Sequence, residues 1–321
     1  MLTAGVLGAG HLGRIHIKNL QVSPHYHLIG YYDPKVDLSQ VHPFDDSLKK
    51  FSSAEELMNA VDVVNIVTPT LSHYEMAKIA INKNKHIFIE KPIAYSTQQA
   101  NEIIELAFKN NIKGQVGHVE RFNPAFKYVE NQIDNPMFIE THRLAEFNPR
   151  GTDVSVVLDL MIHDIDIILH LVSSHVKKIE ASGVSVISKT PDICNARISF
   201  ENGCVANLTA SRISLKKMRK SRFFQKNAYI SIDFLSKKTE LVSLQNAPER
   251  PDEFSLILKN AEGEKKQLFF EDKQFENSNA ILEELDSFAH SIVNDTLTNP
   301  SLEDGAKALN LALEIAKICS D

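Results

Sequence analysis

Gly8-Ala9-Gly10-His11-Leu12-Gly13 is the stretch that decides the fold of this 321-residue chain. It follows an apolar run from Thr3 to Leu7 that predicts a strand, and it opens a stretch from Leu12 to Leu20 that predicts a helix. Glycines at this GxGxxG spacing permit a tight turn and a close approach of the backbone to a ligand. The helix N-terminus offers free N–H groups and a partial positive charge to a pyrophosphate. The stretch therefore predicts a dinucleotide site.

An acidic residue supports this interpretation over that of an ordinary glycine-rich turn. Asp33 ends the second predicted strand about 20 residues after Gly13, where the partner of a ribose is expected. A carboxylate there accepts hydrogen bonds from both ribose hydroxyls and repels a 2′-phosphate. We therefore expect NAD rather than NADP as the cofactor. The cofactor-binding residues expected from this region are Gly8, Gly10, His11, Leu12, Gly13 and Asp33.

The N-terminal part of the chain alternates short β-branched runs with amphipathic stretches, as in a parallel sheet with helices on both faces. Strands are predicted at Thr3 to Leu7, Leu28 to Asp33, Val63 to Thr68, His86 to Glu90 and Lys113 to Gly117. Ser96 and Gln99 form a capping box before a helix. These features predict an N-terminal Rossmann domain, a doubly wound parallel sheet, over residues 1–119.

After Arg121 the pattern changes to longer alternating strands, such as Ile193 to Phe200, with Asn202-Gly203 as a hairpin turn. Helices are predicted at Val154 to Val172, Ser278 to Val293 and Leu302 to Ile318. Residues 120–321 are therefore expected to form a second α/β domain with an open, mostly antiparallel sheet. This domain is expected to bind substrate and to mediate oligomerisation, and its last helix is expected to pack back on the first domain.

Composition narrows the class of partner. A net charge of −6 and a pI near 6.1 make nucleic acid a poor partner. No apolar run approaches the roughly 20 residues of a membrane span, so we expect no membrane segment and a cytoplasmic location. Three scattered cysteines fit neither a disulfide framework nor a Cys-rich zinc site. We expect a small-molecule ligand.

A lysine follows the fourth predicted strand, in Glu90-Lys91-Pro92. Open α/β sheets bind their ligands at the carboxyl ends of the strands, which favours a functional Lys91 over a merely solvated one. The helix from Val154 to Val172 supports this interpretation, because one of its faces carries two histidines and two aspartates. Spaced by three or four, the polar residues of this face are Ser155, Asp159, His163, Asp166 and His170.

Two interpretations of this face remain open. It could be the solvated side of an amphipathic helix, although lysine and glutamate are absent from it. Alternatively, Asp159 orients His163, which acts as a general base for a hydroxyl. A metal site at Asp159, His163 and Asp166 is less favoured, because hydride transfer to a nicotinamide needs no metal. We therefore expect no metal.

Taken together, these motifs resemble those of the Gfo/Idh/MocA oxidoreductases over nearly the whole chain. The motifs are the glycine stretch, Thr68-Pro69 with His73, Glu90-Lys91-Pro92, and Asp159 four residues before His163. The resemblance implies a Rossmann domain followed by an open-sheet α/β domain, and a dimer or tetramer. It also implies that Lys91, Asp159 and His163 are catalytic, and that the cofactor additionally meets Thr68, Pro69, His73, Glu90 and Lys91. The approach Asp153-Val154-Ser155-Val156 departs from the family's glycine-rich pattern.

A narrower resemblance, to the UDP-N-acetylglucosamine 3-dehydrogenases of that family, is carried by Val116 to Pro124 and Leu158 to Asp164. It implies oxidation at C3 of a UDP-N-acetylhexosamine. The alternatives are a dehydrogenase of a free sugar or an inositol-like polyol, and a non-catalytic NAD(H)-binding sensor. Expected substrate residues are Arg121 and Asn123, in a cleft between the domains. Arg212 and Arg219 belong to a basic cluster with Lys216 and Arg222, and they are expected to bind the diphosphate unless this cluster is merely a solvated loop.

Overall fold

The computed structural model describes residues 1–38, 48–148, 154–249, 256–276 and 278–320 and divides into two compact units. The first unit comprises Met1–Phe122 and Asn279–Leu311, and the second comprises Asn123–Ser278 and Ala312–Asp321. The sequence boundary after residue 119 assigned Asn279–Leu311 to the second domain. This segment belongs to the first unit because Leu285 and Phe288 pack into the core of that unit.

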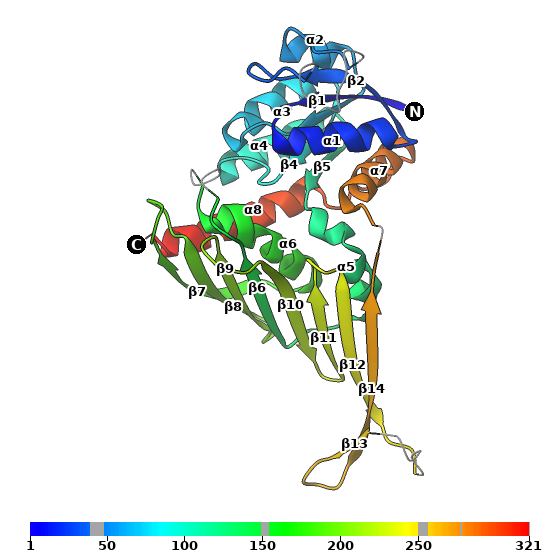
Figure 1. The fold of residues 1–321 in the computed structure, drawn as a ribbon, viewed down its shortest axis with the longest axis vertical. Helices are drawn as coiled ribbons and strands as arrows, with labels where there is room; N and C mark the ends of the chain where they lie inside the picture. Colours follow the sequence, from blue (N-terminus) through cyan, green and yellow to red (C-terminus); the bar gives the residue numbers. More distant parts are fainter. Residues whose placement is uncertain (39–47, 149–153, 250–255, 277, 321) are drawn as a thin grey trace. The chain divides into compact units, whose positions relative to one another are not determined.

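The first unit contains a parallel five-stranded sheet in the order β2-β1-β3-β4-β5 (Figure 1). Its strands are β1 (Leu2–Leu7), β2 (Tyr26–Tyr32), β3 (Val63–Ile66), β4 (His86–Glu90) and β5 (Gly114–Gly117). The chain reverses its winding direction after β2, because β2 and β3 lie on opposite sides of β1. The doubly wound fold expected from the sequence is confirmed.

Helices accompany this sheet: α1 (His11–Val22), α2 (Ala54–Asn59), α3 (His73–Asn82), α4 (Thr97–Lys109), α7 (Ala280–Val293) and the first part of α8 (Leu302–Ile318), with the 3₁₀ turns η1 (Thr70–Ser72) and η2 (Val119–Phe122). The predicted cap of α4 is present, since the Ser96 side chain accepts a hydrogen bond from the Gln99 N–H. Within the described ranges no helix is long and apolar enough to cross a membrane.

The second unit is built on a nine-stranded sheet in the order β13-β14-β12-β11-β10-β6-β9-β8-β7. Its strands are β6 (Phe138–Leu144), β7 (Val176–Val184), β8 (Ile193–Phe200), β9 (Val205–Ser211), β10 (Met218–Gln225), β11 (Ala228–Asp233), β12 (Lys238–Asn246), β13 (Leu256–Lys259) and β14 (Lys265–Gln274). Among these described strands, neighbours pair antiparallel except β6 and β9, which pair parallel. The mostly antiparallel sheet expected from the sequence is confirmed.

Strand β6 is inserted between β9 and β10, which follow each other in the sequence. The last residues of β6 and β9, Leu144 and Ser211, are in register, and Met218 at the start of β10 pairs with Leu144. The connection from Arg212 to Lys217 must therefore pass the end of β6. Here the Ala145 N–H donates to the Ser211 carbonyl, and the Ser214 N–H donates to the Ala145 carbonyl.

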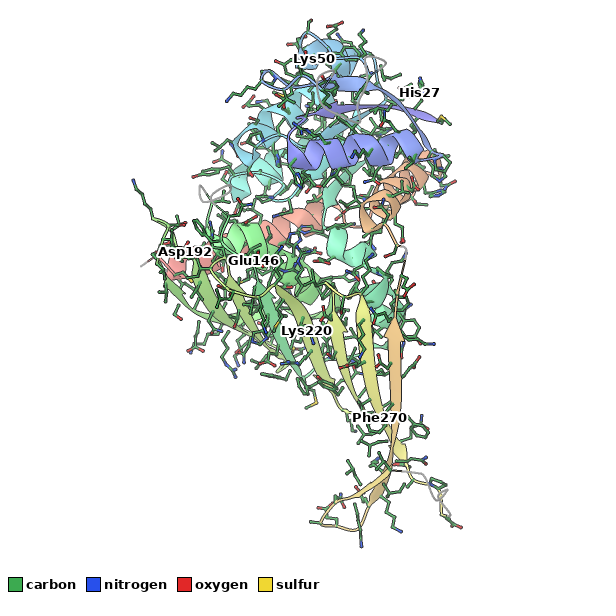
Figure 2. The ribbon with its side chains drawn as sticks, viewed as in Figure 1. His27, Lys50, Glu146, Asp192, Lys220 and Phe270 are labelled. Atoms are coloured by element: carbon green, nitrogen blue, oxygen red, sulfur yellow. The ribbon has the colours of Figure 1, made fainter. Side chains whose placement is uncertain are left out.

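The helices of the second unit are α5 (Pro124–Val129), the 3₁₀ turn η3 (Glu130–Gln132), the π-helix η4 (Val157–Met161), α6 (Ile162–Leu171) and the end of α8 from Ala312 on. Figure 1 labels α5, α6 and α8. Burial alternates along β8 and β9, as expected for strands with one face packed. Apolar side chains are exposed on β13 and β14, among them Phe270 (Figure 2).

The sequence predicted one continuous helix from Val154 to Val172, whereas the structure begins with a π-helix and continues as α6. A π-turn has a wider spacing than an α-turn, so the face counted at three and four residues does not persist. Asp166, three residues after His163 in the regular helix α6, is buried, while Asp159 and His163 are partly exposed. The interpretation of these residues as one solvated stripe is therefore wrong for Asp166.

Candidate functional site

The glycine loop forms a backbone cradle between β1 and α1. Gly8 has a φ of +95°, and a Cβ there would meet the Val67 carbonyl oxygen at 2.5 Å. At Gly13 a Cβ would lie 1.9 Å from the Gly8 carbonyl oxygen, whereas at Gly10 it would meet nothing within 4 Å. Gly10 caps α1 without any side-chain hydrogen bond, which leaves the N–H groups of the first turn for a ligand. His11 is exposed and Leu12 half-buried in this turn.

Asp33 stands beside this cradle, just after β2. One of its carboxylate oxygens accepts a hydrogen bond from the Ala9 N–H at 2.8 Å, and the other accepts from the N–H groups of Lys35 and Val36. Partial burial alone would raise the pKa of Asp33, but the three backbone donors outweigh it and lower the pKa. Asp33 is thus held as a carboxylate next to the glycine loop, as recognition of a ribose requires. Loop, helix end and carboxylate together fit a dinucleotide.

A second group of predicted cofactor residues surrounds the carboxyl ends of β3 and β4. The His73 ring is buried, with Nδ1 2.8 Å from the Pro92 carbonyl oxygen and Nε2 2.8 Å from the Thr68 carbonyl oxygen. Burial lowers the pKa of His73, although both carbonyls favour the charged form. The ring thereby ties the Thr68-Pro69 segment after β3 to the segment that follows Lys91.

Glu90 at the end of β4 turns its carboxylate inward rather than to solvent. It lies 2.9 Å from the Nε2 of buried His16, and a Cβ on Gly117 would come within 2.8 Å of it. Burial would raise the pKa of Glu90, but His16 and the adjacent Lys91 outweigh it and lower the pKa. The role of His16 could not be predicted from the sequence, because its partner Glu90 lies 74 residues away along the chain. Glu90 therefore helps to fix the chain from which Lys91 projects.

In the second unit Asp159 lies on the π-helix η4, and His163 lies in the first turn of α6. The π-turn joins them, and such turns are frequent at functional sites. Asp164, directly after His163, forms a buried bidentate ion pair with Arg143 of β6, with N–O distances of 3.0 and 2.9 Å. This pair anchors the start of α6 to the sheet. Arg143 was missed in the sequence, because nothing in a lone strand arginine indicates its partner.

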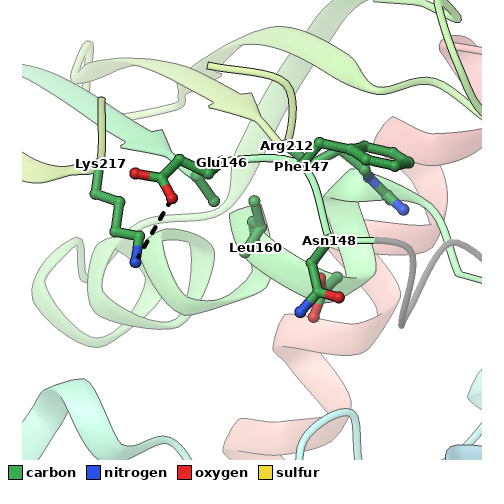
Figure 3. A pocket seen from close by; sticks show the side chains of 8 residues that line it. Glu146, Phe147, Asn148, Leu160, Arg212 and Lys217 are labelled. Carbon is green, nitrogen blue, oxygen red and sulfur yellow. Dashed lines mark ion pairs between the residues drawn. The ribbon is translucent and has the colours of Figure 1, made fainter. Parts of the chain in front are cut away.

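A hollow of about 390 Å³ opens beside Asp159 (Figure 3). The described residues that line it come from the end of β6, from η4 and from the β9–β10 connection: Ala145, Glu146, Phe147, Asn148, Asp159, Leu160, Arg212 and Lys217. In the wall, Lys217 and Glu146 face each other at 4.0 Å. Asp153, in the approach that departs from the family pattern, lies outside the described residues.

Arg212 reaches this hollow from a buried position. It donates a hydrogen bond to the Val154 carbonyl oxygen at 2.7 Å, and its Nε lies 4.0 Å from Asp192 Oδ1. The other oxygen of Asp192 accepts from the N–H groups of Val186, Ile187 and Ser188. Arg212 thus links the chain before η4 to a buried carboxylate, a connection that the sequence did not indicate.

The remaining predicted substrate residues are distributed among separate places. Arg121 is buried in the first unit, where it donates to Asn299 and Asp304. Asn123 is buried in the second unit, where it caps α5 and donates to the Phe234 carbonyl. Their roles toward a substrate stay predictions.

The basic cluster from Lys216 to Arg222 does not act as one surface. Arg219 is in register with Arg143 and shares its side of the sheet with buried Phe223. Lys220 and Arg222 alternate to the opposite side, where Arg222 pairs with Glu140. The cluster is therefore split between the two faces of β10, and the diphosphate role of Arg219 stays a prediction.

The parallel unit with its glycine cradle defines a dinucleotide-binding protein, and comparisons with known proteins narrow the class. Residues 2–118 match the model of the oxidoreductase family with an NAD-binding Rossmann fold, and residues 109–226 match the GFO/IDH/MocA C-terminal domain. The chain belongs to the Gfo/Idh/MocA family of oxidoreductases. It is an NAD-dependent dehydrogenase.

The chain is also similar to individual dehydrogenases. The chain is 35% identical over 236 residues, 73% of its length, to the UDP-N-acetylglucosamine 3-dehydrogenase of Acidithiobacillus ferrooxidans, covering 75% of that protein. The solved structure of the enzyme of that name from the same organism superposes with a TM-score of 0.84 and 28% identity, covering 99% of this chain and 97% of that one. The scyllo-inositol 2-dehydrogenase (NAD(+)) of Bacillus subtilis is 28% identical over 228 residues, 65% of this chain and 67% of that protein.

Proposed function

We propose that the protein oxidises the C3 hydroxyl of a UDP-N-acetylhexosamine, such as UDP-N-acetylglucosamine, to a ketone. The observation that carries the proposal is the hollow of mixed polar and apolar lining beside Asp159, four residues before His163, in a chain whose other unit holds a dinucleotide cradle. The similarity to a UDP-N-acetylglucosamine 3-dehydrogenase supports this choice of substrate.

Each proposed catalytic residue has a role that follows from its chemistry. His163 takes the proton of the sugar hydroxyl, because an imidazole titrates close to neutral pH. Lys91 stabilises the developing alkoxide by a charged hydrogen bond. Asp159 supports the protonated form of His163 as a nearby negative charge. NAD, when bound, supplies the hydride acceptor.

Two substitutions test these roles. Lys91→Ala and His163→Ala should each lower kcat by about 10²- to 10⁴-fold, the usual contribution of such groups, while NAD binding survives in both variants. Stopped-flow turnover and calorimetric NAD titration measure the two quantities. Unchanged turnover in both variants would contradict the assignment.

The substrate is tested by absorbance at the NADH band with UDP-N-acetylglucosamine, N-acetylglucosamine and myo-inositol in parallel. A stoichiometric amount of enzyme reveals a single turnover even where NADH stays bound. A rise with the nucleotide sugar alone is expected. A rise with myo-inositol alone would instead establish the polyol dehydrogenase that the similarity to an inositol dehydrogenase favours as second candidate. NAD binding without turnover on any substrate would favour a sensor.

The assembly is a separate part of the proposal. The exposed apolar side chains of β13 and β14, Leu256, Leu258, Phe269 and Phe270, favour association of the second unit with another copy of the chain. A dimer or tetramer is expected by light scattering, and a monomer at micromolar concentration would contradict it.

A further inference from the structure

The hollow beside Asp159 leaves open which part of a nucleotide sugar it takes. Resting on the proposed function, we infer that it receives the acetamido side of the N-acetylhexosamine ring and not the diphosphate. The hollow is thereby the element that distinguishes N-acetylated from plain hexoses.

Charge is the first reason. Among the described lining residues, the cations Arg212 and Lys217 stand against the anions Glu146 and Asp159. Lys217 lies 4.0 Å from Glu146, and buried Arg212 lies 4.0 Å from the buried carboxylate of Asp192. A diphosphate would therefore meet cations that already have carboxylates beside them, together with carboxylates that repel it. An uncharged polar group meets no such cost.

The lining chemistry is the second reason. Ala145, Phe147 and Leu160 contribute apolar surface, and Asn148 contributes an amide with both donors and an acceptor. An acetamido group presents the same two surfaces, a methyl group and an amide. Ligand sites typically combine apolar walls with a few such polar groups.

The position along the helix is the third reason. Asp159 lines the hollow, and His163 follows four residues later, where the π-helix η4 continues directly into α6. In an N-acetylhexosamine the acetamido carbon C2 is bonded to C3, which carries the reacting hydroxyl. A sugar that presents its C3 hydroxyl to His163 can therefore direct its C2 substituent toward the hollow.

The test compares UDP-N-acetylglucosamine with UDP-glucose, which differ at C2 alone and share the uridine and the diphosphate. Phe147→Ala should lower the kcat/KM for UDP-N-acetylglucosamine relative to that for UDP-glucose by about 10-fold, as expected for a lost apolar contact. Phe147→Leu should lower this ratio by less. Phe224→Ala is the matched control, because Phe224 is 38% exposed and Phe147 39%, but Phe224 does not line the hollow. The control should leave the ratio unchanged.

Lys217→Met tests whether the hollow holds the diphosphate instead of the acetamido group. If it weakened both nucleotide sugars equally while sparing free N-acetylglucosamine, the hollow would hold the diphosphate and the inference would be wrong. A ratio unchanged in Phe147→Ala would overturn it as well. Absence of NADH formation by the wild-type enzyme with either nucleotide sugar would overturn the proposed function itself, and is thus a different result.

Discussion

The candidate sites of the two units differ in whether backbone or side chains form them. The cofactor cradle of the first unit consists of backbone, held by glycines within six consecutive positions and one carboxylate. The hollow of the second unit consists of side chains from three segments, the end of β6, the helix η4 and the β9–β10 connection. A backbone site is specified by local sequence, whereas a side-chain site depends on which strands become neighbours.

The largest expected effect is on the backbone site. Gly13→Ala places a Cβ 1.9 Å from the Gly8 carbonyl oxygen, which the loop cannot relieve by moving a side chain. We expect a loss of about 4 kcal/mol or more in the free energy of unfolding, and loss of NAD binding. Gly10→Ala is the control, since its Cβ meets nothing. It should preserve the melting temperature while weakening NAD by about 10-fold, because the pyrophosphate approaches there. Equal melting temperatures of the two variants would contradict this account of the cradle.

The next effect concerns the anchor of the side-chain site. Arg143→Leu leaves the buried Asp164 carboxylate without its bidentate partner and should cost about 3 kcal/mol in urea unfolding. The double variant Arg143→Leu/Asp164→Leu should recover part of that loss, since no isolated charge stays buried. A double variant less stable than the single one would show that the Asp164 carboxylate stabilises the fold even without Arg143, and would contradict this account.

Acid should weaken the second unit through Asp192. Burial would raise its pKa, but the hydrogen bonds from Ser188, Ile187 and Val186 lower it well below the ordinary 3.8. A depressed folded-state pKa stabilises the fold above the unfolded-state pKa, and this stabilisation is lost as pH falls below about 4 toward the folded value. Asp192→Asn should cost about 1 to 3 kcal/mol at pH 7 and remove that pH dependence. Exposed Asp134→Asn is the control, and a steep acid transition that persists in Asp192→Asn would contradict the role.

The smallest effect is expected on the opposite face of the sheet. Arg222 and Glu140 form an ion pair with both side chains about one-third exposed. Such pairs contribute less than about 1 kcal/mol, so Arg222→Ala should shift the melting temperature slightly and leave kcat/KM unchanged. A large loss of activity would show that the substrate contacts the face of β10 that carries Arg222, and would contradict the different roles proposed for the two faces.

The contrast between a backbone site and a side-chain site explains which features could be predicted from the sequence. The glycine loop, Asp33 and the strand that ends at Glu90 were predicted because turn geometry and alternation are local properties. The same holds for the cap of α4 at Ser96. The family motifs added the class of enzyme.

Other features could not be predicted, for physical reasons. The pairing of Arg143 with Asp164 depends on the packing of α6 against β6, and the partnership of His16 with Glu90 spans 74 residues. The π-turn of η4 was missed because the same apolar pattern is compatible with an α-helix. The hollow was missed because it requires β6 to lie between β9 and β10.

That insertion of β6 has a consequence for how such enzymes diversify. The segments from Ala145 to Asn148 and from Arg212 to Lys217 leave the sheet side by side, after strands that end in register. They supply most of the wall but lie outside the strand ladder. Under the proposed function, exchanging these two short segments would therefore change which sugar is preferred, while the hydrogen bonds between the strands stay the same.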